Sequence, residues 1–348
     1  MLIQSINIVS CIFDINYLFY GNEEFKGITI RNFFVKIVTI AAIFIFVKKY
    51  DDLLTYVLIQ SLSLLISSLS IWLMLSKYIC KIKFKDLEIF KHFKPAFLIF
   101  LPGVAVTIYT VLDKTLIGVI TQNDSCVGNY ENAEKLVKIC ITVISSLGTV
   151  YSSQNAYYYQ TNNYEMLRKN VFDMLCFVGF LSLPMCFGLA AIVDNMIPWY
   201  LGNEYGSENI SSVISMIKVL SPIIVIIGFG TCLGNAVLTA CDKEVKNLIS
   251  VSIAAVINFI LNIIFINVFG AIGACFSTVI AELTCCVLYF VFALNYIELK
   301  KLFIRLIKPI VSSTIMFIIC VLISNKMTSS IINTILLITL GGFVYFIC

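Results

Sequence analysis

Residues 247–266 read NLISVSIAAVINFILNIIFI, and after a four-residue connection residues 271–294 read AIGACFSTVIAELTCCVLYFVFAL. Each stretch is almost entirely apolar and long enough for a helix to cross a bilayer, which takes about 20 residues. Similar stretches occupy roughly residues 1–20, 28–47, 53–76, 95–120, 134–158, 171–193, 213–238, 309–324 and 331–348. The sequence therefore predicts an all-α, polytopic helical membrane protein with about 11 transmembrane helices.

The composition agrees with a chain embedded in a membrane. Of the 348 residues, 60% are hydrophobic and only 13% are charged, and the mean hydropathy is +0.97. A water-soluble domain does not tolerate this apolar content on its surface, which excludes a soluble protein. The net charge of +4 does not indicate nucleic acid, because the basic residues lie in the gaps between apolar stretches.

The basic residues alternate between successive gaps. Of 24 Lys and Arg residues, 16 fall in every second gap, and the other gaps hold three, Lys48, Lys49 and Lys326. Cytoplasmic loops are rich in Lys and Arg, so we expect a cytoplasmic C-terminus and, with 11 spans, Met1 outside. Met1–Tyr20 has no basic n-region typical of a signal peptide, which suggests that helices are missing upstream.

The sequence shows no sign of catalytic or metal chemistry. The 13 cysteines lie mostly in apolar stretches, with no CxxC pair and no Cys/His spacing suited to zinc. We find no Walker A loop, no Ser/His/Asp set and no paired carboxylates on an aqueous loop. We therefore expect no metal, no cofactor and no enzyme activity.

Residues 95–120 carry a polar stripe. Thr107, Thr110 and Lys114 recur at helical spacing and share one face of the predicted helix. Asp113 is adjacent to Lys114, but neighbouring helical residues point about 100° apart and cannot pair face to face. Each of the two charges therefore needs another partner or water.

The next stretch, residues 134–158, has the most continuous polar face. Beginning just upstream with Glu131, this face contains Glu134, Lys138, Thr142, Ser145, Thr149 and Ser152. Such a face lines water or a polar substrate, or else it lets neighbouring helices pack closely. The lysines in the stripes favour the cavity, because charge inside a membrane normally faces a protein interior or water.

Three further charged positions are candidates for function. Lys218 shares a face with Ser211 and Ser215, and Pro222 follows one turn later, so this helix should be bent or locally unwound, as should the helices containing Pro102 and Pro184. Asp14 and Glu282 lie within apolar stretches and could bind a proton or a cation, or could pair with a buried lysine.

Several motifs occur in the order found in a known family. They are DINY (14–17), YGNEEFKGITIRN (20–32), LDK (112–114), VGNYENAEK (127–135), KVLSP (218–222), NFILN (258–262), FGAIGA (269–274) and AE (281–282). Across essentially the whole chain, this pattern resembles bacterial polysaccharide, or O-antigen, flippases of the Wzx type. These are members of the multidrug/oligosaccharidyl-lipid/polysaccharide exporter superfamily.

The resemblance implies two lobes of six helices around a central cavity, often followed by two further helices. Residues 1–80 then match the second half of an N-terminal lobe, residues 95–294 a C-terminal lobe, and residues 309–348 the additional pair. The N-terminal lobe is incomplete, with about three helices missing.

The resemblance also implies that polyprenyl-diphosphate-linked oligosaccharide is moved across the bacterial cytoplasmic membrane by alternating access. We expect Lys114, Lys138 and Lys218 to bind the diphosphate, and Thr107, Thr110, Thr142, Ser145, Thr149 and Ser152 to line the sugar path. Asp14, Asp113 or Glu282 would couple transport to an ion. The expected partners are the lipid-linked oligosaccharide, membrane lipids, and polysaccharide polymerase with its chain-length proteins. No nucleic acid is expected to bind. Alternatives are a cation-coupled drug exporter, a membrane glycan polymerase or ligase, and an inactive truncated product.

Overall fold

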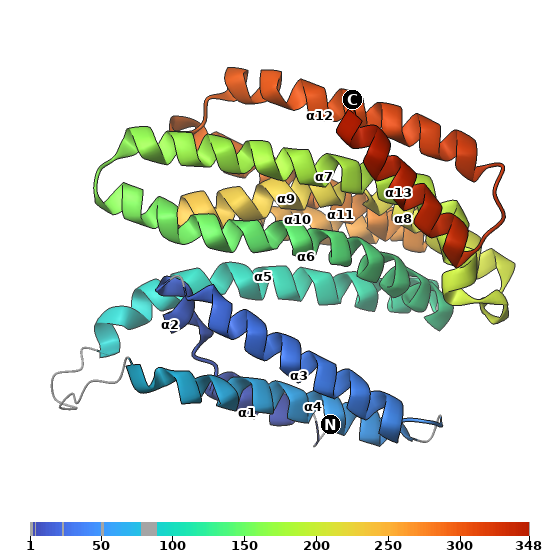
Figure 1. Ribbon diagram of the computed structural model, residues 1–348, viewed down its shortest axis with the longest axis horizontal. Coiled ribbons are helices and arrows are strands. Elements are labelled where there is room, and N and C mark those ends of the chain that lie inside the picture. Colours follow the sequence, from blue (N-terminus) through green and yellow to red (C-terminus); the bar gives the residue numbers. More distant parts are fainter. Residues whose placement is uncertain (1–2, 4, 23, 50–51, 78–88, 348) are drawn as a thin grey trace. The chain divides into compact units, whose positions relative to one another are not determined.

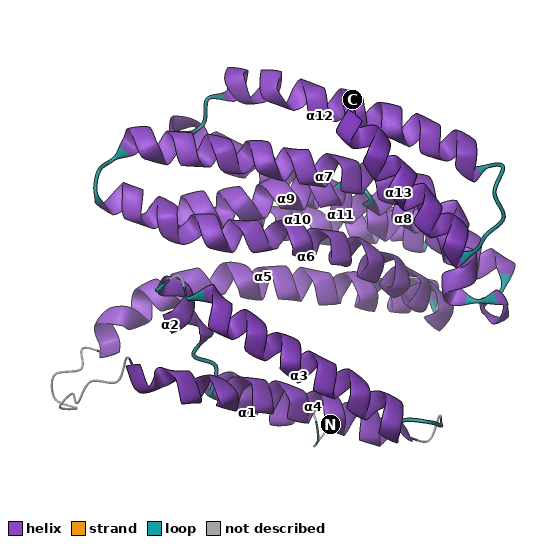
Figure 2. Ribbon diagram, in the orientation of Figure 1, coloured by secondary structure: helices purple, strands orange, loops and turns teal. Residues whose placement is uncertain are grey.

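A computed structural model shows a protein built from helices (Figure 2). The structure describes residue 3 and residues 5–22, 24–49, 52–77 and 89–347, and no strand occurs in these ranges. The predicted all-α fold class is confirmed. Most of the predicted basic loop 77–94 lies outside the described residues.

The chain divides into two compact units, Met1–Ile89 and Phe90–Cys348. The first unit contains two short helices, two long helices and a terminal 3-10 segment. They are α1 (Ser5–Ile12), α2 (Asn16–Gly21), α3 (Phe25–Phe46), α4 (Leu53–Ser70) and η2 (Ile71–Lys77). Its core is small and consists of Phe19, Ile28 and Ile71 with the residues packed on them.

The second unit is larger and begins with three long helices (Figure 1). They are α5 (Ile89–Thr121), α6 (Asp124–Gln160) and α7 (Tyr164–Leu201). After the short turn η4 (Asn203–Tyr205) come α8 (Ser207–Leu220), α9 (Ile223–Leu233), η5 (Gly234–Thr239), α10 (Glu244–Phe269), α11 (Ala271–Ala293), η6 (Leu294–Tyr296), α12 (Leu299–Ser324) and α13 (Ile331–Ile347).

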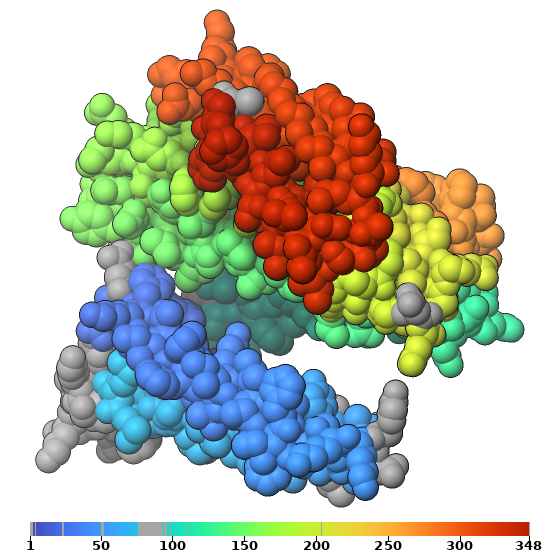
Figure 3. Space-filling model, turned by 45° about the vertical axis from the view of Figure 1, so that its right-hand side comes forward, coloured from blue at the N-terminus to red at the C-terminus, as the bar shows by residue number. Residues whose placement is uncertain are grey.

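One extended hydrophobic core holds this second unit together. It runs from α5 to α12, where apolar side chains meet from several helices at once; fully buried members include Ile144, Val178 and Ile224. A separate small cluster around Met316 and Tyr345 joins α7, α12 and α13. Figure 3 shows α12 and α13, in orange and red, side by side on one face of the unit.

Ten of the eleven predicted spans coincide with a long helix or a bent helix pair among the described residues, and nine of these are long enough to cross a membrane. Among the described residues, eight helices are long and apolar enough to cross a membrane, and the bent pair Ser207–Leu220 and Ile223–Thr239 makes a ninth. The count of about eleven is not confirmed. The predicted span 1–20 forms two short helices, α1 and α2, and the apolar helix α13 has only 17 residues.

The predicted break near Pro222 is confirmed. Helices α8 and α9 meet there at 42°, because proline cannot donate a backbone hydrogen bond to the preceding turn. The helix then continues into η5, a single π-helical segment, where Gly234 packs close to the Tyr289 ring. Helices α5 and α7, in contrast, run on without unwinding through Pro102 and Pro184.

Helices α10 and α11 form a tight hairpin. Gly270 turns the chain with φ of +63° and ψ of −147°, a conformation essentially restricted to glycine. Three residues later, a Cβ atom at Gly273 would lie 2.1 Å from the carbonyl oxygen of Phe265. The FGAIGA motif therefore provides both the turn and the close approach of the two helices.

Candidate functional site: a buried carboxylate and a charged helix face

Asp113, on α5, is almost completely buried within the second unit, with 1% of its surface exposed. Its Oδ1 accepts a hydrogen bond from Asn262 Nδ2 on α10 at 2.6 Å, and its Oδ2 accepts one from Thr278 Oγ1 on α11 at 3.0 Å. The Tyr130 hydroxyl on α6 donates to Oδ2 at 3.3 Å. Four helices thus converge on a single carboxylate.

Among the described residues, the side chains that hydrogen-bond to Asp113 are all neutral. In the part of the chain that the structure describes, no ion pair involves Asp113. Asn262 also donates to Asn258 Oδ1 at 3.0 Å, which leaves Asn262 Oδ1 and Asn258 Nδ2 buried without partners among the described residues. A buried carboxylate needs a counter-charge or a proton, and oxygen atoms of this kind are ligands for hard cations. The arrangement can therefore take up a proton or a small cation.

Lys114 has other partners than the adjacent Asp113, as the helical spacing predicts. Its Nζ lies 3.2 Å from Glu134 Oε2 and 3.8 Å from Glu131 Oε1, both on α6. The other oxygen of Glu134 lies 2.7 Å from Lys138 Nζ, one turn along the same helix. The structure therefore brings Lys114 and Lys138 together through a shared glutamate.

Lys218 belongs to a separate ion pair. Its Nζ lies 2.7 and 2.8 Å from the two carboxylate oxygens of Asp194 on α7. No ion pair or hydrogen bond links Lys218 to Lys114 or Lys138 within the described ranges. The three predicted phosphate-binding lysines therefore do not form one cluster, and each already has a carboxylate partner.

The predicted sugar-path residues lie on α5 and α6, where their side chains are exposed or half-buried in the second unit. Most of their hydroxyls donate to a carbonyl of their own helix, as Thr107 does to Gly103 and Thr142 to Lys138. The same holds for Thr110 and Ser145, whereas Ser152 reaches Asn235 on η5 at 3.4 Å. Thr149 is exposed on the same helix. The hydroxyl oxygens keep lone pairs that can accept hydrogen bonds from a ligand.

Glu282 lines a cavity of about 300 Å³ between α5, α9, η5, α10 and α11. The Tyr289 hydroxyl, also on its wall, donates to Asn247 Oδ1 at 2.7 Å, and Asn247 in turn donates to Thr239 Oγ1 at 3.1 Å. The cavity therefore combines one acid with amide and phenol groups, a lining suited to a small polar or cationic ligand.

Asp14 does not lie within a long transmembrane helix. It is exposed in the connection between α1 and α2, where its Oδ1 accepts a hydrogen bond from the backbone N–H of Asn16 at 2.9 Å. This contact forms an Asx turn just before α2, whose N-cap residue is Ile15, and gives the carboxylate a structural role.

Sequence reasoning identified Asp113 but missed the residues around it. Asn258 and Asn262 are one turn apart and both fully buried in the apolar helix α10. Two amides at this spacing within a long apolar run are a signal that could have been used, because buried polar groups need partners. Tyr130 and Thr278 carry no such signal, and only the packing of α6 and α11 brings them to Asp113.

Comparison with known proteins agrees with this architecture. The family model described as "Polysaccharide biosynthesis protein" matches residues 2–151. The chain is also 25% identical over 213 residues to a protein of Haloferax volcanii named "Probable low-salt glycan biosynthesis flippase Agl15". This match covers 60% of the chain and 43% of the relative, so the chain spans less than half the length of that protein. These two matches make the chain similar to polysaccharide-biosynthesis proteins over part of its length.

Two solved structures share the fold of this chain. The lipid II flippase MurJ, in an inward closed conformation, superposes with a TM-score of 0.70 over 94% of this chain and 67% of MurJ, at 19% identity. The crystal structure of a MATE mutant gives a TM-score of 0.56 over 72% of this chain and 56% of its own, at 15% identity. The chain is thus a multi-pass membrane protein with the MurJ/MATE transporter fold.

Proposed function

We propose that the chain moves oligosaccharide repeat units linked through diphosphate to a polyprenol across the bacterial cytoplasmic membrane. The observation that carries this proposal is the chain of charges Lys114–Glu134–Lys138. In it, Lys114 of α5 contacts the face of α6 that carries Glu134, Lys138 and the exposed hydroxyls. A hydrated sugar needs hydroxyl partners, and a diphosphate needs cations that can exchange one anion for another. The family match and the two named flippases support this substrate class.

Residue roles follow from these contacts. An incoming diphosphate would compete with Glu134 and Glu131 for the two lysines, so binding substrate exchanges one anionic partner for another. Lys218 could act in the same way against Asp194. The hydroxyls of Thr107, Thr110, Thr142, Ser145, Thr149 and Ser152 would contact the sugars. The function is transport by alternating access rather than catalysis.

Asp113 is the best candidate for coupling to a cation gradient. Its carboxylate accepts hydrogen bonds from neutral side chains of three other helices. Binding or release of a cation at this carboxylate would therefore change the contacts between α5, α6, α10 and α11. Glu282 remains a second candidate because it lines a cavity, whereas the exposed Asp14 is the weakest of the three.

We also propose the domain organisation implied by the resemblance. Residues 1–80 would form the second half of an N-terminal lobe, residues 95–294 the C-terminal lobe, and residues 309–348 two additional helices. The C-terminus would be cytoplasmic, and a polysaccharide polymerase with its chain-length proteins would use the translocated product.

The test is translocation of a fluorescent polyprenyl-diphosphate oligosaccharide in proteoliposomes. Lys114→Gln and Lys138→Gln should each reduce the rate at least tenfold, because each removes a charge-assisted contact of about 1.5–3 kcal/mol. Lys326→Gln, in the connection between α12 and α13, removes the same charge away from the polar face and should leave the rate unchanged. Normal translocation by both Lys114→Gln and Lys138→Gln would refute the proposal.

A drug exporter of the same superfamily is the second candidate. Glu282 and Tyr289 give the cavity in the second unit an acidic and an aromatic wall, a combination that binds organic cations. This function predicts that Glu282→Gln abolishes efflux of a cationic dye, while Lys114→Gln does not affect it.

A further inference from the structure

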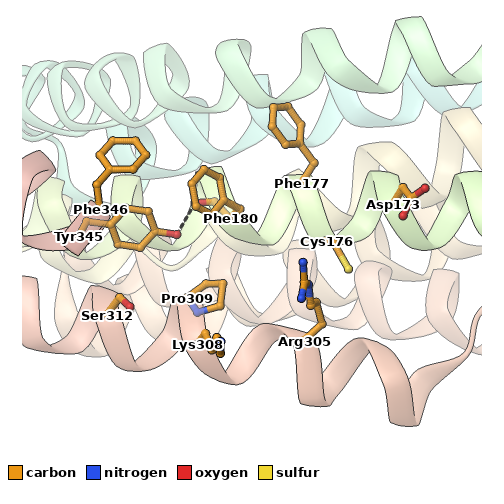
Figure 4. A pocket seen from close by; sticks show the side chains of 10 residues that line it. All are labelled: Asp173, Cys176, Phe177, Phe180, Arg305, Lys308, Pro309, Ser312, Tyr345 and Phe346. Atoms are coloured by element: carbon orange, nitrogen blue, oxygen red, sulfur yellow. Dashed lines mark hydrogen bonds between the residues drawn. The ribbon is translucent and has the colours of Figure 1, made fainter. Parts of the chain in front are cut away.

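A groove of about 480 Å³ lies between α7, α12 and α13, outside the sites described above. Figure 4 shows the ten side chains that line it, with Arg305 reaching from α12 toward α7. No residue of α5 or α6 contributes to its wall. The groove is therefore separate from the polar face proposed for sugar and diphosphate.

Two cations lie in the groove one turn apart on α12, Arg305 and Lys308. Within the described residues, neither forms an ion pair, although the wall also contains Asp173. Lys114, Lys138, Lys218 and Lys301 all have carboxylate partners. An unpaired cation within a membrane helix is stable only if water or an anion reaches it.

The rest of the groove is aromatic. Phe180 and Tyr345 pack with ring centroids 5.3 Å apart, and the Tyr345 hydroxyl donates to the Phe180 carbonyl at 2.7 Å. Phe177 and Phe346 remain 42% and 76% exposed. A second, almost entirely apolar groove of about 380 Å³ shares Phe180, Tyr345 and Phe346 with the first. One end of the combined surface thus suits an anion and the other suits acyl chains.

We propose that this groove binds an anionic phospholipid of the surrounding bilayer. The phosphate would contact Arg305 and Lys308, and the acyl chains would lie over the phenylalanine rings. Basic pockets between transmembrane helices are typical sites for anionic headgroups, and each basic side chain near the membrane surface adds to the binding of an anionic lipid. Arg305 and Lys308 lie at the end of α12 that also carries Lys300 and Lys301, the end predicted to be cytoplasmic. The proposal does not depend on the transported substrate.

A tryptophan in the groove provides a direct test. Phe177→Trp, in the full chain reconstituted in vesicles, should be quenched several-fold more by brominated phosphatidylglycerol than by brominated phosphatidylcholine at the same mole fraction. Phe303→Trp is the matched control. Phe303 is 67% exposed, and two residues along the helix place it about 200° around the axis of α12 from Arg305, on the nearly opposite face. It should be quenched equally by both lipids. Trp72 and Trp199 contribute the same background to both variants.

Charge variants then test the headgroup contact. Arg305→Gln combined with Lys308→Gln should abolish the preference for phosphatidylglycerol, a change of roughly tenfold or more. Lys300→Gln combined with Lys301→Gln removes the same charge outside the groove and should retain it. If the first pair fails to fold, Asp173→Asn serves instead and should strengthen the preference. Equal quenching at Phe177→Trp by both lipids, an equal loss in both double variants, or displacement by equimolar polyprenyl diphosphate would each overturn the proposal.

Discussion

At the scale of single residues, the Asp113 carboxylate has three hydrogen bonds and no cation partner in the described chain. Asp113→Asn keeps the shape of the side chain and removes its charge, so the network can persist without binding a cation. If the thermal unfolding temperature of the unchanged protein depends on Na⁺ concentration or on pH, we expect this variant to fold and to lose that dependence. Asp124→Asn, at the exposed start of α6, is the control and should behave as the unchanged protein.

A retained cation dependence in Asp113→Asn would exclude this carboxylate as the coupling site. A second variant separates binding from packing. Asn262→Leu removes the 2.6 Å contact to Asp113 Oδ1 while preserving apolar volume. It should weaken the cation dependence without abolishing it, because Thr278 and Tyr130 still contact the carboxylate.

Helical spacing alone predicted that Asp113 and Lys114 have different partners, and the structure confirms this. Sequence also located the charges on α6, because Glu134 and Lys138 are one turn apart. It could not show that Lys114 reaches Glu134 or that Lys218 reaches Asp194, since these contacts join helices whose relative rotation is set by tertiary packing.

At the scale of helices, the α10–α11 hairpin depends on glycine at its closest approach. A Cβ at Gly273 would lie 2.1 Å from a backbone oxygen of Phe265, which no side-chain movement can relieve. We expect Gly273→Ala to destabilise the protein by about 1–3 kcal/mol, the usual cost of overpacking. Gly342→Ala, on α13 with no atom within 4 Å of its Cβ, is the matched control. Thermal unfolding of the two variants should differ by several degrees, and equal values would contradict the tight hairpin.

Apolar length and proline position predicted most helices, because both act within a single segment. The nine helices of span length and the break before α9 follow from these local rules. The split of residues 1–20 into α1 and α2 could not be predicted from mean hydropathy, although Asp14 marks its position. The π-helical segment η5 was also missed, since its carbonyl contacts with Ser152 and Asn155 come from α6.

At the scale of the whole molecule, the two compact units differ in how much core each one has. The unit Phe90–Cys348 contains a continuous core that runs from α5 to α12, and 39% of the apolar window of α7 is buried. The unit Met1–Ile89 has three buried hydrophobic residues in its cluster, and only 6% of the corresponding window of α3 is buried. Since tertiary stability follows buried contacts, the two units should not unfold together.

We therefore expect the full chain in detergent micelles to unfold in two thermal transitions. The fragment 90–348 should be recovered as a monodisperse protein and should show only the upper transition, at nearly the same temperature, because its core lies within its own sequence. The fragment 1–89, as the companion control, should lack a cooperative transition. One single transition for the full chain, together with aggregation of the fragment 90–348, would show that the larger unit needs the smaller one in order to fold.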